Sequence, residues 1–223
     1  MICFGNPYIK MLIPNKLNTI IRILLVNHFD KKPGLQVTTL AKKAGITPAM
    51  AKRLVLRLEK SEYVGLGKGI KVNNAIKLMR AWSYCFSIRE VERLEFVAAE
   101  RPQYIMLKIV NKARLWKLSY AFTLFSATEH INPFVAPSDT YLYILKKDIK
   151  AWQSLFKQEN MLPTEKNGDV ICLPVDEEYF EGVWEARGVK VAAIPQLYAD
   201  LFSYGGRGEE AAKELAARYF QDV

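Results

Sequence analysis

The amino-acid sequence predicts an α+β protein of two domains, a small basic helix-turn-helix domain with a wing-like hairpin followed by a larger mixed α/β domain. Charge supplies the first observation. Residues 1–82 contain 15 Lys and Arg against three acidic residues, a net charge of +12, whereas residues 83–223 carry a net charge of −3. Pattern supplies the second, because helices and a glycine-rich hairpin give way to strands that alternate with helices. A chain of 223 residues is long enough to form two hydrophobic cores.

Composition excludes several classes of protein. Half of the residues are apolar, as in globular proteins, and no stretch is long and apolar enough to span a membrane. The first 15 residues are interrupted by Pro7 and Pro14 and have no basic lead-in, so we do not expect a signal peptide. The cysteines and histidines are isolated in the sequence: Cys3, Cys85, Cys172, His28 and His130. We therefore expect a cytoplasmic protein with no disulfide scaffold, no metal site, no cofactor and no membrane contact.

The first domain is predicted at residues 13–82 and begins with a helix. Apolar residues recur at helical spacing in NKLNTIIRILLVNHF, before the turn-rich sequence DKKPG. The stretch QVTTLAKKAGI then predicts a strand-like start and a brief helix, capped by Thr38 and ended by Gly45. In TPAMAKRLVLRLEK, Thr47 is a favourable N-cap and Pro48 suits the first helical position. Two helices joined by a short turn that contains Gly are typical of a helix-turn-helix.

A hairpin and a linking helix follow. The sequence YVGLGKGIKVN predicts two short strands with Gly67, Lys68 and Gly69 at the tip, which form a small basic wing. NAIKLMRAWSYCF, residues 74–86, predicts a helix that leads out of the domain. The first domain is therefore expected to be a winged helix-turn-helix.

These features indicate double-stranded DNA as the partner of the first domain. A strong positive charge on one domain is typical of proteins that bind a polyanion, and the second helix of a helix-turn-helix enters the major groove. The candidates for groove contact on that helix are Thr47, Ala49, Met50, Lys52 and Arg53, and Arg57 is a further candidate for DNA contact. The candidates for phosphate contact, which sets the register, are Lys42, Lys43, Lys68 and Lys71. Many winged helices bind proteins instead, but the charge of the domain favours DNA.

The second domain, at residues 87–223, alternates strands and helices. Strands are predicted in EFVAAE, KLSYAFT, TYLYIL, VICLPV and VKVAAI. Helices are predicted in RPQYIMLKIVNKARL, TLFSATEHI and DIKAWQSLF, and two more flank GGRG near the C-terminal end. NPFVAPSD is predicted as a loop and MLPTEKNGD, residues 161–169, as a turn. The pattern indicates a sheet covered by helices.

Three segments of this domain carry a resemblance to a known family. YAFTLFSATEHINPFVAP, then TYLYIL, and then VAAIPQLYADLFSYGGRGEEAAKEL are similar to the AbiEi family of antitoxin-type transcriptional regulators from type IV toxin–antitoxin systems. With the basic winged helix, the resemblance covers nearly the whole chain. It implies a repressor of its own operon that neutralises a toxin resembling a nucleotidyltransferase. It also implies a second domain with a nucleotidyltransferase-like fold, usually without working catalytic residues.

The residues that a nucleotidyltransferase needs are missing. Such an enzyme has Gly-Ser at a helix start and Asp-x-Asp on the following strand, because paired carboxylates hold Mg²⁺ against a triphosphate. Neither pattern occurs in this sequence. The equivalent helix start reads TLFS, from Thr123, and the strand carries Tyr141 and Tyr143 in place of carboxylates. The acidic cluster at residues 176–178 has no phosphate-binding glycines beside it and is interpreted as a solvated turn. We expect no catalytic residues.

The sequence GGRG, residues 205–208, raises the question of a phosphate-binding loop, but is interpreted as the joint between two helices. Its first two glycines would end one helix with left-handed backbone angles. Glu209, in the first turn of the next helix, favours the helix dipole and would repel a phosphate. Arg207 is expected to pair with Asp200 or a nearby glutamate. In the alternative interpretation, Arg207 and Glu209 contact a partner protein.

The sequence favours a non-enzymatic, sequence-specific DNA-binding regulator that represses its own operator and acts as the antitoxin of a type IV system. A second hypothesis is an interaction protein that neutralises a nucleotidyltransferase-like toxin without strong DNA binding. A third is a nucleotidyltransferase-type enzyme. Repressors of this type commonly read inverted repeats as homodimers or as two copies on adjacent half-sites, and the sequence leaves this choice open.

Overall fold

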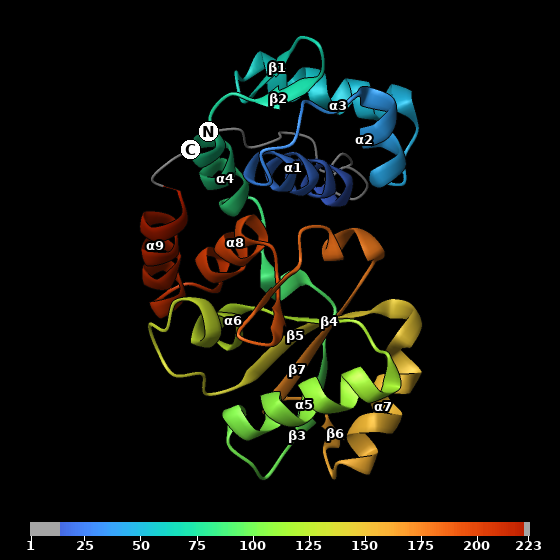
Figure 1. The fold of residues 1–223 in the computed structure, drawn as a ribbon, viewed down its shortest axis with the longest axis vertical. Helices are drawn as coiled ribbons and strands as arrows, with labels where there is room; N and C mark the ends of the chain where they lie inside the picture. The colour runs from blue at the N-terminus through green and yellow to red at the C-terminus, as the bar shows by residue number, and fades with distance from the viewer. Residues whose placement is uncertain (1–13, 221–223) are drawn as a thin grey trace. The chain divides into compact units, whose positions relative to one another are not determined.

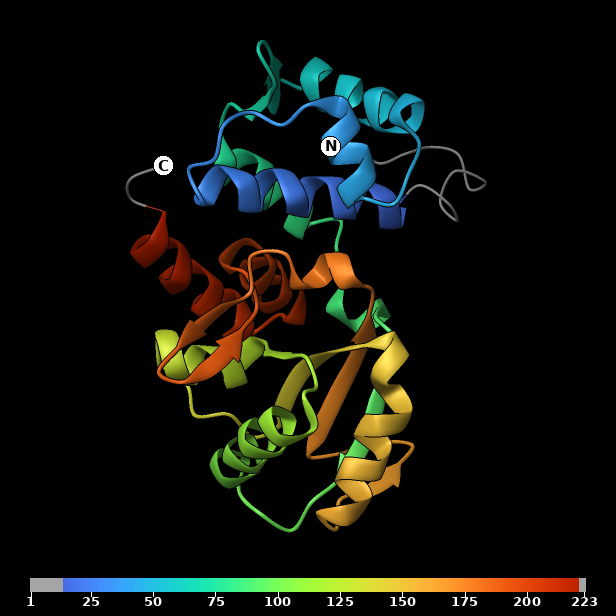
Figure 2. The same cartoon turned by 45° about the vertical axis from the view of Figure 1, so that its right-hand side comes forward.

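The computed structural model describes residues 14–220, which form two compact units at residues 14–86 and 87–220. Figure 1 and Figure 2 show the helices and strands of each unit. Residues 1–13 and 221–223 lie outside the described residues. The predictions on the start of the first domain and on the expected absence of a signal peptide concern residues 1–13.

Helices and a hairpin form the first unit. Its elements are α1 (Pro14–Phe29), α2 (Val37–Lys43), α3 (Pro48–Lys60), β1 (Val64–Leu66), β2 (Ile70–Val72) and α4 (Ala75–Ser83). β1 and β2 are antiparallel, with Leu66 opposite Ile70. Leu35 pairs with the other side of Ile70 through two backbone hydrogen bonds of 3.1 and 2.7 Å. The hairpin therefore has a third, one-residue strand that comes from the segment before α2.

The helix predicted to read DNA, α3, forms as the sequence indicates. The Thr47 hydroxyl accepts a hydrogen bond from the backbone N–H of Met50 at 3.2 Å, and Pro48 is the first helical residue. The apolar stripe of the helix is buried: Ala51, Leu54, Val55 and Leu58. The same core contains Trp82 of α4, whose indole N–H donates to Asn18 of α1 at 3.1 Å. One face of α3 is thereby fixed against the unit, and the opposite face is left to solvent.

The start of α2 differs from the prediction. Thr38 was expected to cap this helix, but the helix begins at Val37 and its N-cap is Gln36, with extended backbone angles of φ −73° and ψ 147°. Thr38 lies within the first turn and is exposed, so the predicted cap is wrong. The predicted stop is confirmed, because α2 ends at Lys43 and Gly45 has φ +60°, which glycine adopts without strain.

A seven-stranded mixed sheet forms the second unit. Its strands are β3 (Leu94–Val97), β4 (Tyr120–Phe122), β5 (Thr140–Leu145), β6 (Leu162–Thr164), β7 (Val170–Val175), β8 (Trp184–Ala186) and β9 (Val189–Val191). They lie in the order β6-β3-β7-β5-β4-β9-β8. The pairs β5–β7 and β4–β9 are parallel, and the other neighbours are antiparallel. All six residues of β7 are buried, as are all but one of β5, so the centre of the sheet is the core of this unit.

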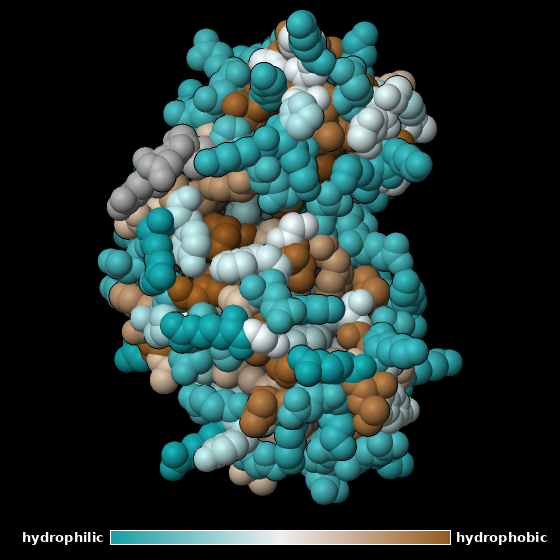
Figure 3. Space-filling model, in the orientation of Figure 1, coloured by the Kyte–Doolittle hydropathy of each residue, from teal (hydrophilic) through white to brown (hydrophobic). Residues whose placement is uncertain are grey.

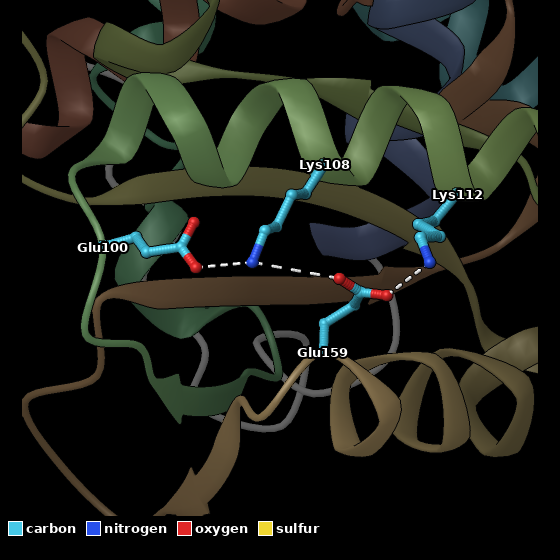
Figure 4. A network of polar contacts seen from close by, with 4 residues as sticks. All are labelled: Glu100, Lys108, Lys112 and Glu159. Atoms are coloured by element: carbon cyan, nitrogen blue, oxygen red, sulfur yellow. Dashed lines mark hydrogen bonds and ion pairs between the residues drawn. The ribbon is translucent and has the colours of Figure 1, made fainter.

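Helices cover this sheet. They are α5 (Pro102–Trp116), α6 (Leu124–Ile131), α7 (Ile149–Gln158), α8 (Ile194–Tyr204) and α9 (Arg207–Tyr219), with 3-10 turns η1 (Ile88–Glu90), η2 (Lys146–Asp148) and η3 (Glu177–Phe180). Phe96 of β3 packs on Phe156 of α7, with ring centroids 4.7 Å apart. Figure 4 shows how α5 is tied to the end of α7, since Lys112 pairs with Glu159 at 2.6 Å. Lys108 of α5 lies between Glu100, at 2.5 Å, and Glu159, at 3.9 Å.

Two strands of the second unit were not predicted. β6 lies inside the stretch interpreted as a turn, residues 161–169, and β8 lies in a segment with no predicted element. Both are three-residue strands at the two edges of the sheet. Pro163 stands in β6, where an edge strand tolerates a residue that has no N–H to donate. The neighbouring strands, and not local propensity, place these two segments in the sheet.

Candidate functional site

The solvent-facing side of α3 carries most of the residues predicted to contact the DNA groove. Thr47, Ala49, Lys52 and Arg53 are exposed, and Met50 and Arg57 are half-buried. The positions 49, 52, 53 and 56 follow helical spacing and lie opposite the buried stripe. The structure therefore places one small residue and two cations together on one accessible face.

Leu56 lies on the same face and was not among the predicted residues. Leu56 is 38% exposed, although leucine is apolar and is usually buried. The signal was present in the sequence, since Leu56 follows Arg53 by three positions and lies outside the apolar stripe. We add Leu56 to the candidate interface.

The residues predicted to contact phosphates lie on α2 and on the hairpin. Lys42 and Lys43 are exposed at the end of α2, and Lys68 and Lys71 are exposed on the tip and on β2. Figure 1 and Figure 2 both place the hairpin and α3 along one edge of the first unit, with α1 and α4 on its other side. In Figure 3 mainly hydrophilic side chains cover this edge.

Most of these cations have no carboxylate partner. Among residues 14–220, none of the following forms an ion pair: Lys42, Lys52, Arg53, Lys68 and Lys71. Unneutralised cations on one edge attract a polyanion, because each phosphate contact releases condensed counterions from nucleic acid. The edge formed by α3, the end of α2 and the hairpin is the candidate nucleic-acid interface.

The second unit has a buried polar cluster that joins α8, β5 and the start of α6. The carboxylate of Asp200, on α8, accepts hydrogen bonds from the Thr123 hydroxyl at the start of α6, from the Tyr143 hydroxyl of β5 at 2.8 Å and from the Gln196 amide at 2.6 Å. All four side chains are at most 1% exposed. A carboxylate surrounded by protein donors and shielded from water ties α8 to the sheet and is closed to a metal-bound triphosphate.

The start of α6 is also filled by internal contacts. The Ser126 hydroxyl accepts a hydrogen bond from the backbone N–H of Tyr141 at 2.9 Å and donates to the carbonyl of Asp139 at 3.2 Å. Tyr141 packs edge-on against Tyr204 of α8, at 6.2 Å between ring centroids, and burial raises the pKa of its hydroxyl. Ser126, Tyr141 and Tyr204 therefore help to hold β5, α6 and α8 together.

Leu124, the first residue of α6, has an unexpected backbone conformation. Its φ is +51°, a region in which L-residues other than Asn and Asp are strained, and its side chain is fully buried. A buried leucine is held there by its packing. Sequence reasoning gave no indication of this strain, because the pattern TLFS is that of an ordinary helix start.

The acidic cluster at residues 176–178 faces solvent at η3. Lys146 pairs with Asp176 at 3.4 Å and Lys147 with Glu177 at 2.5 Å, and the hydrogen bond from Lys147 lowers the pKa of Glu177. Within residues 14–220 no group of three His, Cys, Asp or Glu side chains is placed to hold a metal ion. None of the helices described is long and apolar enough to cross a membrane.

The GGRG stretch joins two helices, as predicted. α8 ends at Tyr204 and α9 begins at Arg207, and Gly205 and Gly206 have φ of +82° and +54°. Their ψ angles, 174° and −123°, lie outside the left-handed helical region, so the predicted left-handed cap geometry is wrong. The positive φ angles nevertheless favour glycine at both positions. A Cβ on Gly208 would overlap the backbone carbonyl oxygen of Leu201, so this glycine lets α9 pack closely against α8.

The ion pair expected for Arg207, with Asp200 or a nearby glutamate, does not form among residues 14–220. Arg207 is exposed, and Asp200 is engaged in the buried cluster, so the expected pair between them does not form. Glu209 pairs with Lys213 along α9 at 3.0 Å. Arg207 and Glu209 remain candidates for contact with a partner protein.

Comparison with known proteins bears on both units. A family model described as the transcriptional regulator and AbiEi antitoxin of type IV toxin–antitoxin systems matches residues 71–221. The chain belongs to the AbiEi antitoxin family. The resemblance seen in the sequence is thus confirmed, and with it the class of transcriptional regulator and antitoxin. The match begins in β2, includes α4 and the described second unit, and leaves α1, α2 and α3 outside it. No curated protein matches the chain.

Proposed function

We propose that this AbiEi-family protein is a sequence-specific DNA-binding regulator that represses its own operon, and that its first unit is a winged helix-turn-helix. The supporting observation is the edge of the first unit on which α3 and the hairpin present exposed cations without carboxylate partners. On this proposal the N-terminal part of α3 enters the major groove, and Lys42, Lys43, Lys68 and Lys71 bind phosphates.

Fluorescence anisotropy tests this proposal. The purified protein is titrated against a duplex from upstream of its own gene and against a scrambled duplex, over a series of salt concentrations. We expect tighter binding to the native duplex and an affinity for both that falls steeply with salt. Equal affinity for the two duplexes would contradict a sequence-specific repressor. Size-exclusion chromatography of the complex with light scattering then distinguishes a homodimer from two copies on adjacent half-sites.

The second unit is proposed to be a nucleotidyltransferase-like, noncatalytic domain that supplies the antitoxin activity against a nucleotidyltransferase-like toxin. Two observations favour this: the family match lies mainly on this unit, and Asp200 is enclosed by Thr123, Tyr143 and Gln196. Co-expression with the toxin gene expected beside its own tests it. A variant with Arg53→Ala and Lys68→Ala should still protect cells when it is expressed from an unrelated promoter.

That experiment separates the two hypotheses on the antitoxin role. If protection is lost together with DNA binding, the protein acts through repression alone, and the second unit has no independent activity against the toxin. The enzyme hypothesis has its own test, which is calorimetry with Mg²⁺ and a nucleoside triphosphate. Mg²⁺-dependent binding of the triphosphate would support it, and the absence of such binding would remove it. We propose a cytoplasmic location because DNA and toxin are both found there.

A further inference from the structure

The hairpin of the first unit is attached to the segment before α2 at three points. Leu35 exchanges two backbone hydrogen bonds with Ile70. The backbones of Gly34 and Gly69 approach so closely that a Cβ on Gly69 would overlap the carbonyl oxygen of Gly34. The third point lies at the tip itself, where the side-chain amide of Gln36 donates to the backbone carbonyl of Lys68 at 2.7 Å. This is the single side-chain hydrogen bond to the tip among the described residues.

Gln36 occupies a position that normally has another task. It is the N-cap of α2, where a short polar side chain would accept a hydrogen bond from the first turn and stabilise the helix. Gln36 makes no such bond. Its longer side chain extends to the hairpin instead, across 32 residues of sequence. Gln36 therefore bonds to the hairpin tip and not to the first turn of α2.

The tip of the hairpin, residues 67–69, has few packing neighbours on one side. No atom outside the neighbouring residues lies within 4 Å of a Cβ built on Gly67, so the tip has open space on that side. The Lys68 side chain is exposed and has no carboxylate partner among residues 14–220. A cation on a loose loop loses more conformational entropy when it binds a phosphate than a cation on a fixed loop.

We propose that Gln36 is a positioning residue for DNA binding, which holds Lys68 in register with α2 and α3 so that wing and helices contact one duplex together. This inference rests on the proposed DNA-binding function. Gln36 itself need not touch DNA, because it acts through the backbone of Lys68. The same residue starts the helix that carries Lys42 and Lys43, so one side chain links two sets of phosphate contacts.

Gln36→Ser separates positioning from stability. Serine is a good N-cap but is too short to reach the Lys68 carbonyl, so the melting temperature should be unchanged or higher. In anisotropy, the affinity for native and scrambled duplexes should fall about three-fold, the size expected for loss of one hydrogen bond, while the preference between the duplexes stays constant. The matched control is Gln103→Ser, which changes an exposed glutamine of α5 and should leave both affinities unaltered.

A double-mutant cycle with Lys68→Ala decides whether Gln36 acts through Lys68. Lys68→Ala alone should weaken binding to all sequences and reduce the salt slope by about 1. In that background Gln36→Ser should have no further effect. An equal loss in both backgrounds, or full affinity of Gln36→Ser in the wild-type background, would overturn the positioning role alone. A wild-type protein that binds no DNA would overturn the proposed function, and this inference with it.

Discussion

The candidate interface of the first unit and the buried cluster of the second unit place their polar residues in opposite environments. In the first unit, Lys52, Arg53 and Lys68 point into solvent and lack carboxylate partners within the described residues. In the second unit, Thr123 and Asp200 are fully buried and bonded to each other. The first arrangement has unsatisfied charge that a ligand can neutralise, whereas the second has satisfied its donors and acceptors internally.

This difference indicates where substitutions should affect binding and where they should affect folding. On the proposed function, a change on the exposed edge of the first unit should remove a contact to DNA and leave the fold almost intact. A change in the buried cluster of the second unit leaves polar groups without partners in a medium that cannot hydrate them, which lowers the free energy of unfolding. The predictions below test this division, in order of decreasing effect.

Asp200→Ala should have the largest effect. It removes the acceptor that the buried hydroxyls of Thr123 and Tyr143 share with the buried amide of Gln196, and should lower the free energy of unfolding by about 3 kcal/mol. Urea denaturation measures the change. The control is Asp176→Ala, which removes an exposed carboxylate paired with Lys146. A loss below about 1 kcal/mol for Asp200→Ala would show that the cluster does not hold the unit together.

Gly208→Ala should have the next largest effect. Its new methyl group would overlap the carbonyl oxygen of Leu201, so α9 would have to move away from α8 at a cost of about 2 kcal/mol. Gly67→Ala, at the hairpin tip, is the matched control because no atom lies near its Cβ position. Thermal melting compares the two variants. Equal melting temperatures would mean that the α8–α9 joint adapts, and that its glycine has no packing role.

Much of the fold follows from the sequence, because local signals and tertiary structure agree there. Thr47, Pro48 and the apolar stripe of α3 define that helix unambiguously, and the apolar run VICLPV becomes the buried strand β7. The edge strands β6 and β8 could not be predicted, since three residues carry too little pattern and their pairing comes from distant segments.

Part of the candidate site also follows from the sequence, and part does not. The exposed cations of α3 follow from helical spacing, but the hydrogen bond between Gln36 and Lys68 does not, because a glutamine before a helix gives no signal of a partner 32 residues away. The expected pair between Arg207 and Asp200 was wrong for a related reason. Asp200 faces the sheet and accepts hydrogen bonds from Tyr143 of β5 and from Thr123 at the start of α6, which only the folded chain brings near.

Arg53→Ala tests the exposed edge of the first unit. If Arg53 contacts a base edge as proposed, loss of its guanidinium should weaken binding to the native duplex about ten-fold, with a much smaller effect on the scrambled duplex. Stability should not change, because Arg53 is exposed and forms no ion pair among residues 14–220. The control is Arg114→Ala, which removes one exposed positive charge from α5. If both variants lose affinity equally, net charge and not the α3 contact governs binding.

The smallest effect is expected for Glu159→Gln, which breaks the ion pairs of Figure 4. Glu159 bonds to Lys112 at 2.6 Å and lies 3.9 Å from Lys108, yet both lysines are more than a third exposed. Solvent screens such pairs, so we expect a loss of about 0.5 kcal/mol in urea denaturation, reduced further by salt. A loss that approached that of Asp200→Ala would contradict this division, because a partly exposed network of the second unit would then stabilise it as strongly as the buried cluster. A small loss would instead agree with the view that the buried cluster around Asp200 stabilises the second unit more than these ion pairs do.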